Sequence, residues 1–315
     1  MLDIKVKKET AILFITFARD EYARLTFDQI KKAKPGKLYF YSNKARCEYP
    51  EEIKKNGVIR AFINEIDWEC DLKIFFREKH ADVYTSLWSA IDWLFENEER
   101  GIIIEEDCVP SLAFFDFCRQ LLPKFETDMR IWLISGDNFF DNYNPNGYDY
   151  IFSRYPFQWG WASWRSRWQL IERNNIPWEK IKSYELYRQL FPSKREADFH
   201  IKNEEGIYNF VQKKPAWDFI MGFSAKNNGA FGIVPAINLV SNIGIQGTHN
   251  KKLNKLIHNR NTSSLDYYTI RNEPPFVVPD YKYDRYFFKK FHYKSTLLHV
   301  RFIKKMKRIL NKIFS

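Results

Sequence analysis

The residues best suited to chemistry are three consecutive acids, Glu105-Glu106-Asp107, which directly follow the apolar run Gly101-Ile-Ile-Ile. Adjacent carboxylates repel one another unless a cation or hydroxyl donors engage them. In open α/β sheets ligands bind beyond the carboxyl ends of the strands, and an apolar strand ending in acids fits that position. Hard cations take oxygen ligands, so the run predicts Mn2+ or Mg2+ bridging a diphosphate. A solvated turn after a buried strand is the alternative.

A second candidate is the tryptophan-rich segment 158–168, which contains Trp159, Trp161, Trp164 and Trp168. Aromatic rings offer large faces for contact with other rings, including those of sugars. Trp159-Gly160-Trp161 therefore predicts a pocket loop for a sugar or an acceptor. Trp164 and Trp168 are four residues apart, and core packing is the favoured interpretation for those two.

The elements that position these residues follow from hydrophobic periodicity. Apolar runs alternate with helix-length segments over roughly the first 135 residues, a pattern typical of a parallel sheet wound with helices. Leu25, Ile30 and Ala33 are expected to face the core from the first helix, and Trp88, Ile91 and Phe95 from a later one. The predicted strands are 11–17, 37–41, 72–76, 101–104 and 130–134, and the predicted helices are 20–34, 82–96 and one N-capped by Ser111 that runs to 125.

The second half of the chain has shorter segments and dense aromatic residues. It predicts helices at 197–213 and 216–227, a strand at 236–241, and loop or ordered tail after 248. The last segment, 296–315, is different because its apolar residues recur every three or four positions with Lys and Arg between them. This basic amphipathic helix suits an anionic membrane surface, and packing against its own domain is the alternative.

The net charge of +11 does not indicate a nucleic-acid partner. Residues 289–315 carry nine Lys and Arg and no acid, so without them the net charge of +11 falls to +2. A domain near neutrality lacks the broad basic face that binding to a duplex needs.

The four cysteines form no CxxC pair, so neither a zinc site nor a disulfide framework is predicted. The N-terminal residues show no signal-peptide pattern, and no apolar run is long enough to span a bilayer. Together with the basic tail, this predicts a cytoplasmic protein located peripherally at the inner face of the cell membrane.

Four ordered motifs then carry a specific resemblance. GIIIEEDCVPSLAFFDFC, RIWLISGDNF, YIFSRYPFQWGWASWRSRW and PAINLVSNIG resemble the bacterial haemolytic-protein-like family of nucleotide-diphospho-sugar transferases. That family is similar to N-acetylglucosaminyltransferase I, an inverting enzyme of the GT-A (Rossmann-like) α/β fold with a mixed sheet. The resemblance covers about the first 250 residues. It implies metal-dependent, inverting transfer of a sugar from a nucleoside diphosphate, expected to be UDP, to a glycan or lipid-linked acceptor in the synthesis of a bacterial surface polysaccharide or glycoprotein.

The resemblance also assigns roles to residues. Asp107 is the expected metal ligand, with Glu105 and Glu106 near the ribose and the donor sugar. Asp218 matches the segment that holds the general base, and Trp217 beside it belongs to the acceptor pocket. A base is needed because the acceptor hydroxyl loses its proton as it attacks. From the sequence alone, Asp218 also fits an acid that stabilises the first turn of a helix.

The remaining candidates lie at other strand ends. Thr16 and Arg19 stand in the turn that contacts the nucleotide in that family, and His249 in a late segment that reaches the metal or diphosphate in many GT-A enzymes. Asn43 replaces the usual Asp-Gly pair and could hydrogen-bond a base. Arg77 could meet the diphosphate, although the Asn-Leu-Gly-Cys turn of the family is absent here; an ion pair on the surface is the alternative.

The predicted organisation is a catalytic domain over 1–250, with a nucleotide-binding half at 1–135 and an acceptor half at 136–250, then an extension at 251–295 and the basic helix at 296–315. Two other functions stay open. A sugar nucleotidyltransferase usually has a glycine-rich phosphate loop after its first strand, and Thr16-Phe-Ala-Arg-Asp20 has no glycine. A non-catalytic glycan-binding or membrane-active protein would tolerate neutralisation of the acids at 105–107.

Overall fold

The computed structural model describes residues 10–143, 146–155, 157–173, 177–244, 260, 262 and 265–293. The chain divides into two compact units. One consists of Met1–Ile171 and Ala216–Pro279, and the other of Glu172–Pro215 and Asp280–Ser315. Among the described residues, every strand belongs to the first unit.

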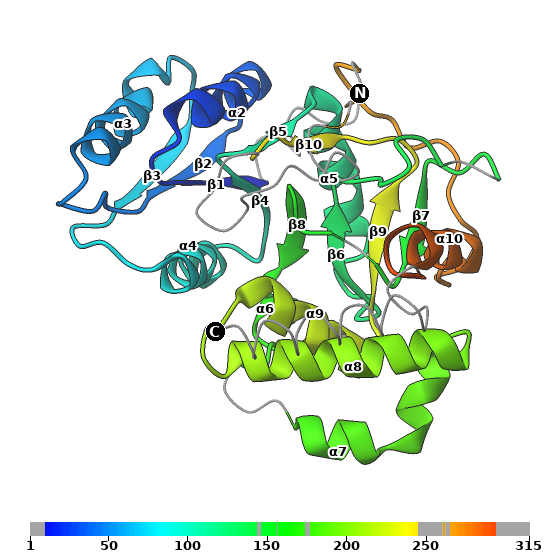
Figure 1. Cartoon of the computed structure of the whole chain (residues 1–315). Helices are drawn as coiled ribbons and strands as arrows, with labels where there is room; N and C mark the ends of the chain where they lie inside the picture. The colour runs from blue at the N-terminus through cyan, green and yellow to red at the C-terminus, as the bar shows by residue number, and fades with distance from the viewer. Residues whose placement is uncertain are drawn as a thin grey trace. The chain divides into compact units, whose positions relative to one another are not determined.

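The first unit is built on an eight-stranded sheet with the order β3-β2-β1-β4-β8-β6-β9-β7 (Figure 1). Strands β1 to β4 are parallel to one another, β8 runs antiparallel to β4 and β6, β9 is parallel to β6, and β7 is antiparallel to β9. The predicted α/β class and mixed sheet are therefore confirmed. The strands are β1 (Ala11–Thr16), β2 (Lys37–Ser42), β3 (Asp71–Phe76), β4 (Arg100–Glu105), β6 (Ile131–Ser135), β7 (Tyr150–Ser153), β8 (Trp161–Trp164) and β9 (Phe231–Pro235).

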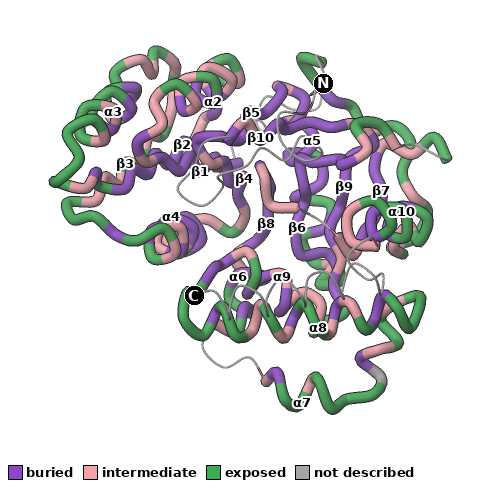
Figure 2. The backbone as a smooth tube through the Cα atoms, in the orientation of Figure 1, coloured by how far each residue is buried: buried purple, intermediate pink, exposed green. Residues whose placement is uncertain are grey.

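The central strands were predictable because both of their faces are covered. All six residues of β1 are buried, and so is the apolar stretch of β4 (Figure 2). Continuous apolar runs of this kind are typical of parallel strands that carry helices on both faces. Ile12 and Phe14 pack with residues of α2 (Asp20–Ala33), α3 (Pro50–Arg60) and α5 (Leu112–Lys124).

The opposite face of these strands is covered by α4 (Val83–Asn97), which packs against β1 and β4. Gly101 allows this approach, because a Cβ there would lie 2.7 Å from Leu94 Cδ2. The Asp82 carboxylate caps α4 by accepting hydrogen bonds from the backbone N–H groups of Tyr84 and Thr85.

The first predicted helix is confirmed, with one error about its inward face. Leu25 is 51% exposed, and α2 instead buries Ala23, Thr26, Phe27 and Ile30. These four positions follow the three- and four-residue spacing of one helical face, and Leu25 falls outside it. Acids in the first turn and lysines in the last complement the helix dipole.

The predicted strand at 236–241 is wrong in its bounds. The chain forms β9 up to Pro235, makes an isolated antiparallel bridge between Ile237 and Asn142, and forms a strand again at β10 (Val240–Asn242), which is antiparallel to β5 (Cys108–Pro110). Between them Asn238 turns the chain, because its amide donates to the carbonyl of Val240 and its backbone N–H donates to that of Asp141. The unit also contains η1 (Ala61–Glu65), α6 (Arg165–Trp168) and α9 (Trp217–Asn227).

The second unit is helical in its described part. It contains α7 (Trp178–Ser183), η2 (Glu185–Leu190), α8 (Lys194–Val211) and α10 (Tyr281–Phe291). Phe199 on α8 contacts Phe288 on α10, with ring centroids 5.5 Å apart. The sequence predicted a helix near α8 but placed α10 in a loop or tail, although α10 buries Tyr283, Asp284, Phe287 and Phe288 along one face. The predicted amphipathic helix at 296–315 lies outside the described residues.

Among the helices of the described ranges, none has the length and apolar character needed to cross a membrane.

Candidate active site

The acidic run lies where the sequence predicted, at the carboxyl end of a central strand. Glu105 is the last residue of β4, and Glu106 and Asp107 form the turn into β5. The pairing of β5 with β10 brings a later segment alongside, because the backbone N–H of Ile243 donates to the carbonyl of Asp107 at 2.8 Å. Two segments far apart in the sequence thus share the edge of the sheet that parallel α/β folds use for ligands.

Glu106 has a structural role in this arrangement. Its carboxylate accepts hydrogen bonds from Arg19 Nε and from the backbone N–H of Phe17, both at 2.7 Å. Its main-chain carbonyl accepts from the Thr26 hydroxyl at 2.9 Å. Glu106 is buried and both carboxylate oxygens are engaged, so it fixes the loop after β1 to the acidic turn.

The Asp107 carboxylate forms an ion pair with Arg19 and lies close to Gly244. Its Oδ2 lies 2.8 Å from Arg19 Nη1. A Cβ at Gly244 would lie 2.1 Å from the same oxygen. Burial lowers the pKa of Arg19, but the charges of Asp107 and Glu106 outweigh this effect and raise it above its ordinary value. Arg19 therefore remains a cation that neutralises part of the acidic turn.

Glu105 differs from its two neighbours because no hydrogen bond to its carboxyl group is found among the described residues. Burial raises the pKa of Glu105 to about 8, the charge of Asp107 adds to this effect, Arg19 opposes it, and Asp218 and Glu106 raise it further. Asp218 is thus close enough for its charge to act on Glu105. Asp218, the candidate base, therefore interacts electrostatically with the acidic run although the two lie more than 100 residues apart in sequence.

Asp218 occupies the first turn of α9 and is partly exposed. Burial raises the pKa of Asp218, and hydrogen bonding to the backbone of Phe219 opposes this shift. Asp218 is therefore compatible with both roles predicted from the sequence. Its carboxylate complements the dipole of α9, and its charge also acts on Glu105 of the acidic run. A carboxylate with a raised pKa is a stronger proton acceptor once it is ionised.

The tryptophans divide into core and surface. Trp161 on β8 and Trp217 on α9 are buried and stack on each other, with centroids 5.1 Å apart and planes at 16°. These two rings therefore belong to the core, which corrects their prediction as pocket residues. Trp164 and Trp168 are also buried, as core packing predicted.

Trp159 remains partly exposed and contacts Phe139 and Phe157, so it is still a pocket candidate. Gly160 beside it has a positive φ of 65°, which favours glycine. A Cβ at this position would also lie 2.8 Å from Val240 Cγ2. Gly160 thus allows the chain to turn closely against β10.

The other predicted nucleotide contacts are engaged in internal bonds. The Thr16 hydroxyl donates to the carbonyl of Tyr41, which ties β1 to β2. Both polar atoms of the Asn43 amide are used, with Nδ2 donating to the carbonyl of Ala81 and Oδ1 accepting from the backbone of Lys44 and Ala81. Arg77 donates to the Ser89 hydroxyl at 3.2 Å, and within the described part of the chain it forms no ion pair with an acid. His249 lies outside the described residues.

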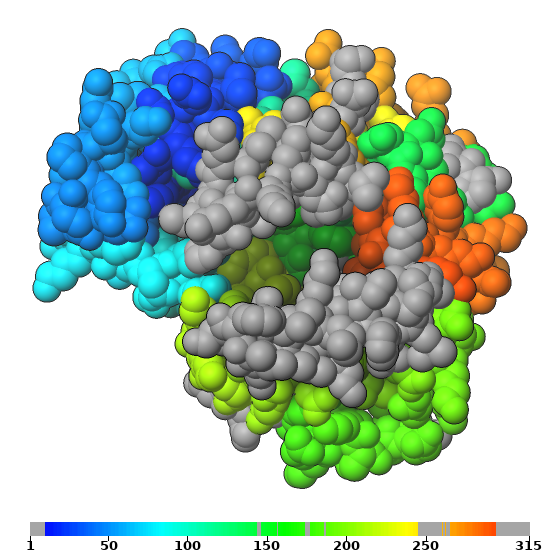
Figure 3. Space-filling view, in the orientation of Figure 1, coloured from blue at the N-terminus to red at the C-terminus, as the bar shows by residue number. Residues whose placement is uncertain are grey.

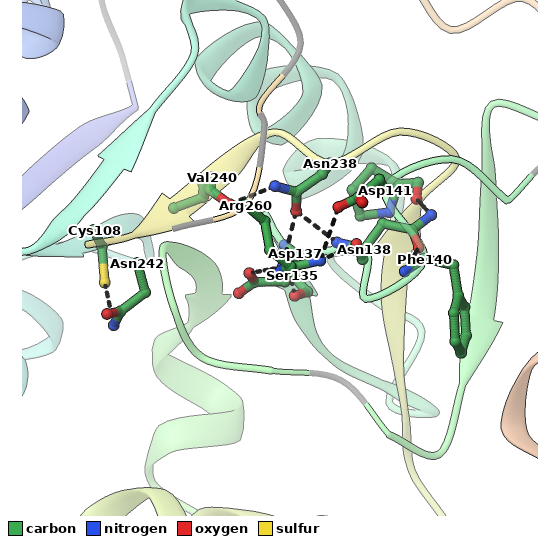
Figure 4. A network of polar contacts seen from close by, with 11 residues as sticks. Cys108, Ser135, Asp137, Asn138, Phe140, Asp141, Asn238, Val240, Asn242 and Arg260 are labelled. Carbon is green, nitrogen blue, oxygen red and sulfur yellow. Dashed lines mark hydrogen bonds and ion pairs between the residues drawn. The ribbon is translucent and has the colours of Figure 1, made fainter. Parts of the chain in front are cut away.

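A polar network after β6 was not predicted. Arg260 Nη2 donates to Asp137 Oδ1 at 2.7 Å and to Asn238 Oδ1 at 3.1 Å, and its Nη1 donates to the carbonyl of Asn138 (Figure 4). Asp137 is buried, and burial raises its pKa to about 7 against the opposing charge of Arg260. The signal was present in the motif ISGDNF, but the partner lies 123 residues away in sequence.

Figure 3 shows the blue and cyan N-terminal segments on the left of the face and parts of the green and olive segments near its centre. Within the described ranges, no group of three or more His, Cys, Asp or Glu side chains is arranged to hold a metal ion by protein ligands alone.

Comparison with known proteins gives distant structural neighbours. No family model matches the chain, and the search of curated proteins also gives no match. A mannosyltransferase from Pyrobaculum calidifontis, solved with GDP-Man and Mn2+, is 10% identical over 70% of this chain and 69% of its own, with a TM-score of 0.37.

Two further solved structures are similar. A 4-diphosphocytidyl-2C-methyl-D-erythritol synthase from Anaerococcus prevotii is 8% identical over 66% of this chain and 84% of its own, with a TM-score of 0.31. A UTP-bound UGPase from Acinetobacter baumannii is 6% identical over 74% of this chain and 88% of its own, with a TM-score of 0.35. All three TM-scores lie below 0.5.

Proposed function

We propose that this protein is a metal-dependent glycosyltransferase of the GT-A type, which moves a sugar from a nucleoside diphosphate to an acceptor hydroxyl. The observation that carries the proposal is the acidic run at the carboxyl end of β4, with Asp218 near enough for its charge to raise the pKa of Glu105. Four parallel strands followed by the antiparallel β8 suit a sheet that binds a nucleotide over its first half and an acceptor over its second.

A divalent cation fits the residues present. Asp107 offers a carboxylate as an oxygen ligand, and the absence of a side chain at Gly244 leaves room for its Oδ2, because a Cβ there would lie 2.1 Å from that oxygen. One or two carboxylates suffice when phosphate oxygens supply other ligands. Asp107 would hold the ion, with His249 as a further proposed ligand. When bound, such a cation stabilises the negative charge that develops on the leaving diphosphate.

The chain's own groups would then divide the remaining work. Asp218 accepts the proton of the acceptor hydroxyl. At the same time the hydroxyl oxygen forms the new bond to the anomeric carbon, and the bond between that carbon and the diphosphate breaks. Glu105 would contact the donor sugar and Trp159 the acceptor, and Arg19 holds the acidic turn in place. In-line displacement of this kind inverts the anomeric centre.

The acceptor and location are part of the same proposal. A glycan or a lipid-linked acceptor at an anionic membrane surface suits the basic residues of 296–315. The protein would then act at the inner face of the membrane in surface polysaccharide or glycoprotein synthesis.

The test is turnover of a panel of UDP-, GDP- and dTDP-sugars with and without Mn2+, measured as release of the nucleoside diphosphate. We expect turnover with one donor that is lost in Asp107→Asn and in Asp218→Asn, and retained in the control Asp266→Asn, which alters an exposed acid. Formation of a nucleotide sugar from a nucleoside triphosphate and a sugar phosphate would instead identify a nucleotidyltransferase. Neither reaction, with no nucleotide bound, would favour a glycan-binding or membrane-active protein.

A further inference from the structure

The carboxyl ends of β1, β2 and β3 are held together by two side chains of α3. Asn56 Nδ2 donates to the carbonyls of Phe17 and Asn43. Arg60 Nη2 donates to the carbonyls of Ser42, Asn43 and Arg77. The three loops that follow these strands therefore form one connected surface beside the acidic run.

Asn43 joins the second and third of these loops. Its amide donates to the carbonyl of Ala81 at 2.8 Å and accepts from the backbone N–H of Ala81 at 3.2 Å. Asn43 is only 4% exposed. A side chain with both polar ends paired in this way fixes the loop that carries residue 80, and it has little capacity left to read a base.

His80 projects from that fixed loop and is exposed. Its Nδ1 lies 2.8 Å from the carbonyl oxygen of Lys44. A carbonyl can only accept, so Nδ1 carries the hydrogen, and in the neutral ring Nε2 is then an acceptor. Nε2 makes no hydrogen bond with the described residues.

Phe17 supplies an aromatic face next to His80. The two ring centroids are 5.6 Å apart with planes at 47°. The backbone of Phe17 is fixed on both sides, because its N–H donates to Glu106 and its carbonyl accepts from Asn56. The ring is partly exposed, and its backbone is bonded directly to the acidic run.

We propose that Phe17 and His80 form the base subsite of the donor nucleotide and select a base with a ring N–H. This inference rests on the proposed function. The face of Phe17 stacks on the base, and His80 Nε2 accepts from a ring N–H such as N3–H of uracil or thymine or N1–H of guanine. Cytosine and adenine carry a lone pair at the corresponding ring nitrogen, which would oppose the lone pair of Nε2 and leave both unpaired.

The test measures equilibrium binding of UDP, dTDP, GDP, CDP and ADP to the full chain with Mn2+, with inorganic pyrophosphate as a probe that lacks a base. We expect UDP, dTDP or GDP to bind about 10-fold or more tightly than CDP and ADP, since a site with an unpaired polar group rejects a ligand. The tightest of the three identifies the base. His80→Leu should remove this preference, and Lys79→Ala, which changes the adjacent exposed side chain, should retain it.

Phe17→Leu should weaken the binding of every nucleoside diphosphate by about 5-fold to 100-fold, because stacking of a base on an aromatic ring contributes that much to affinity. Phe17→Tyr keeps the ring and should bind like the wild type, and pyrophosphate should bind all variants alike. If the wild type binds all five nucleoside diphosphates with equal affinity, and neither Phe17→Leu nor His80→Leu changes that affinity, the base subsite is overturned and the proposed function stays intact. Absence of binding by the wild type to every nucleoside diphosphate would overturn the proposed function itself.

Discussion

Arg19 Nη1 lies 2.8 Å from Asp107 Oδ2, and Nε of the same guanidinium lies 2.7 Å from Glu106 Oε1. One cation thus joins the loop after β1 to the acidic turn after β4. The positive charge of Arg19 compensates these two buried carboxylates. It also leaves Arg19 beside the oxygen that we assign to a metal ion.

Replacement of Arg19 by Met should lower the free energy of unfolding by about 2–3 kcal/mol, because it leaves the buried Glu106 without its cation. The value is below that of a fully buried pair since the Arg19 side chain is 34% exposed. Chemical denaturation measures the change. The matched control is Arg24→Met, whose partner Glu65 is 36% exposed and for which a loss below about 1 kcal/mol is expected. Equal losses in both variants would contradict the role given to Arg19.

Gly244→Ala should impair metal-dependent donor binding, and it should also lower stability by about 1–3 kcal/mol because it displaces a packed carboxylate. The new Cβ would lie 2.1 Å from Asp107 Oδ2, so the carboxylate has to turn away from its position. Calorimetry with Mn2+ and a nucleoside diphosphate should show a loss of about 10-fold or more in affinity. Gly57→Ala in α3 is the control, because its Cβ meets no atom within 4 Å and the change should stabilise the helix by about 0.5–1 kcal/mol. Unchanged affinity in Gly244→Ala would argue against Asp107 as the ligand.

Asp218→Asn should reduce turnover by about 100-fold to 10,000-fold, since general base catalysis commonly contributes this much. The affinity for the donor should stay close to that of the wild type, because the substitution preserves shape and Asp218 acts on the acceptor. Steady-state kinetics together with equilibrium binding separates the two quantities. If Asp218 only stabilises the first turn of α9, the variant will lose stability and retain its turnover.

The buried Asp137 predicts a pH dependence of stability. Burial raises its pKa from 3.8 to about 7. The pKa of Asp137 is higher in the folded state than in the unfolded state. Its stabilising contribution to the free energy of unfolding is therefore fully present below about pH 4 and is lost as the pH rises through about 7. Between about pH 5 and 7 the free energy of unfolding of the wild type should fall by about 1–2 kcal/mol, and that of Asp137→Asn should not show this decrease. Denaturation curves of both proteins over this range measure the difference, and parallel profiles would contradict it.

The first four parallel strands and the helices α2, α4 and α5 could be predicted because each has a local signature, whereas α3 was not predicted. Strands buried on both faces, such as β1, appear as unbroken apolar runs, and α4 shows its core residues at helical spacing. The antiparallel β8 could not be found in this way, since its four residues read Trp-Ala-Ser-Trp and its partners β4 and β6 lie far away in sequence. Pairing between distant segments, which no local pattern encodes, decides such strands.

The site shows the same division. The acidic run at 105–107 was visible because three adjacent carboxylates are unusual at a strand end. Asn56, Arg60 and the pair Asp137–Arg260 were missed because each acts through contacts with backbone or side chains distant in sequence. Trp161 and Trp217 were misassigned for the opposite reason, since their residue type suggests a sugar platform and only the packing shows them stacked in the core.

The most direct test of the account is the melting temperature of wild type and Asp107→Asn with Mn2+ and UDP, GDP or dTDP, added singly and together. A ligand at 100 times its dissociation constant stabilises the folded state by about 2.7 kcal/mol. We predict that one nucleotide raises the melting temperature of the wild type only when Mn2+ is present, and that Asp107→Asn loses this rise while melting normally without ligand. A rise of equal size in both proteins, or none in the wild type, would contradict a metal-diphosphate site at the end of β4.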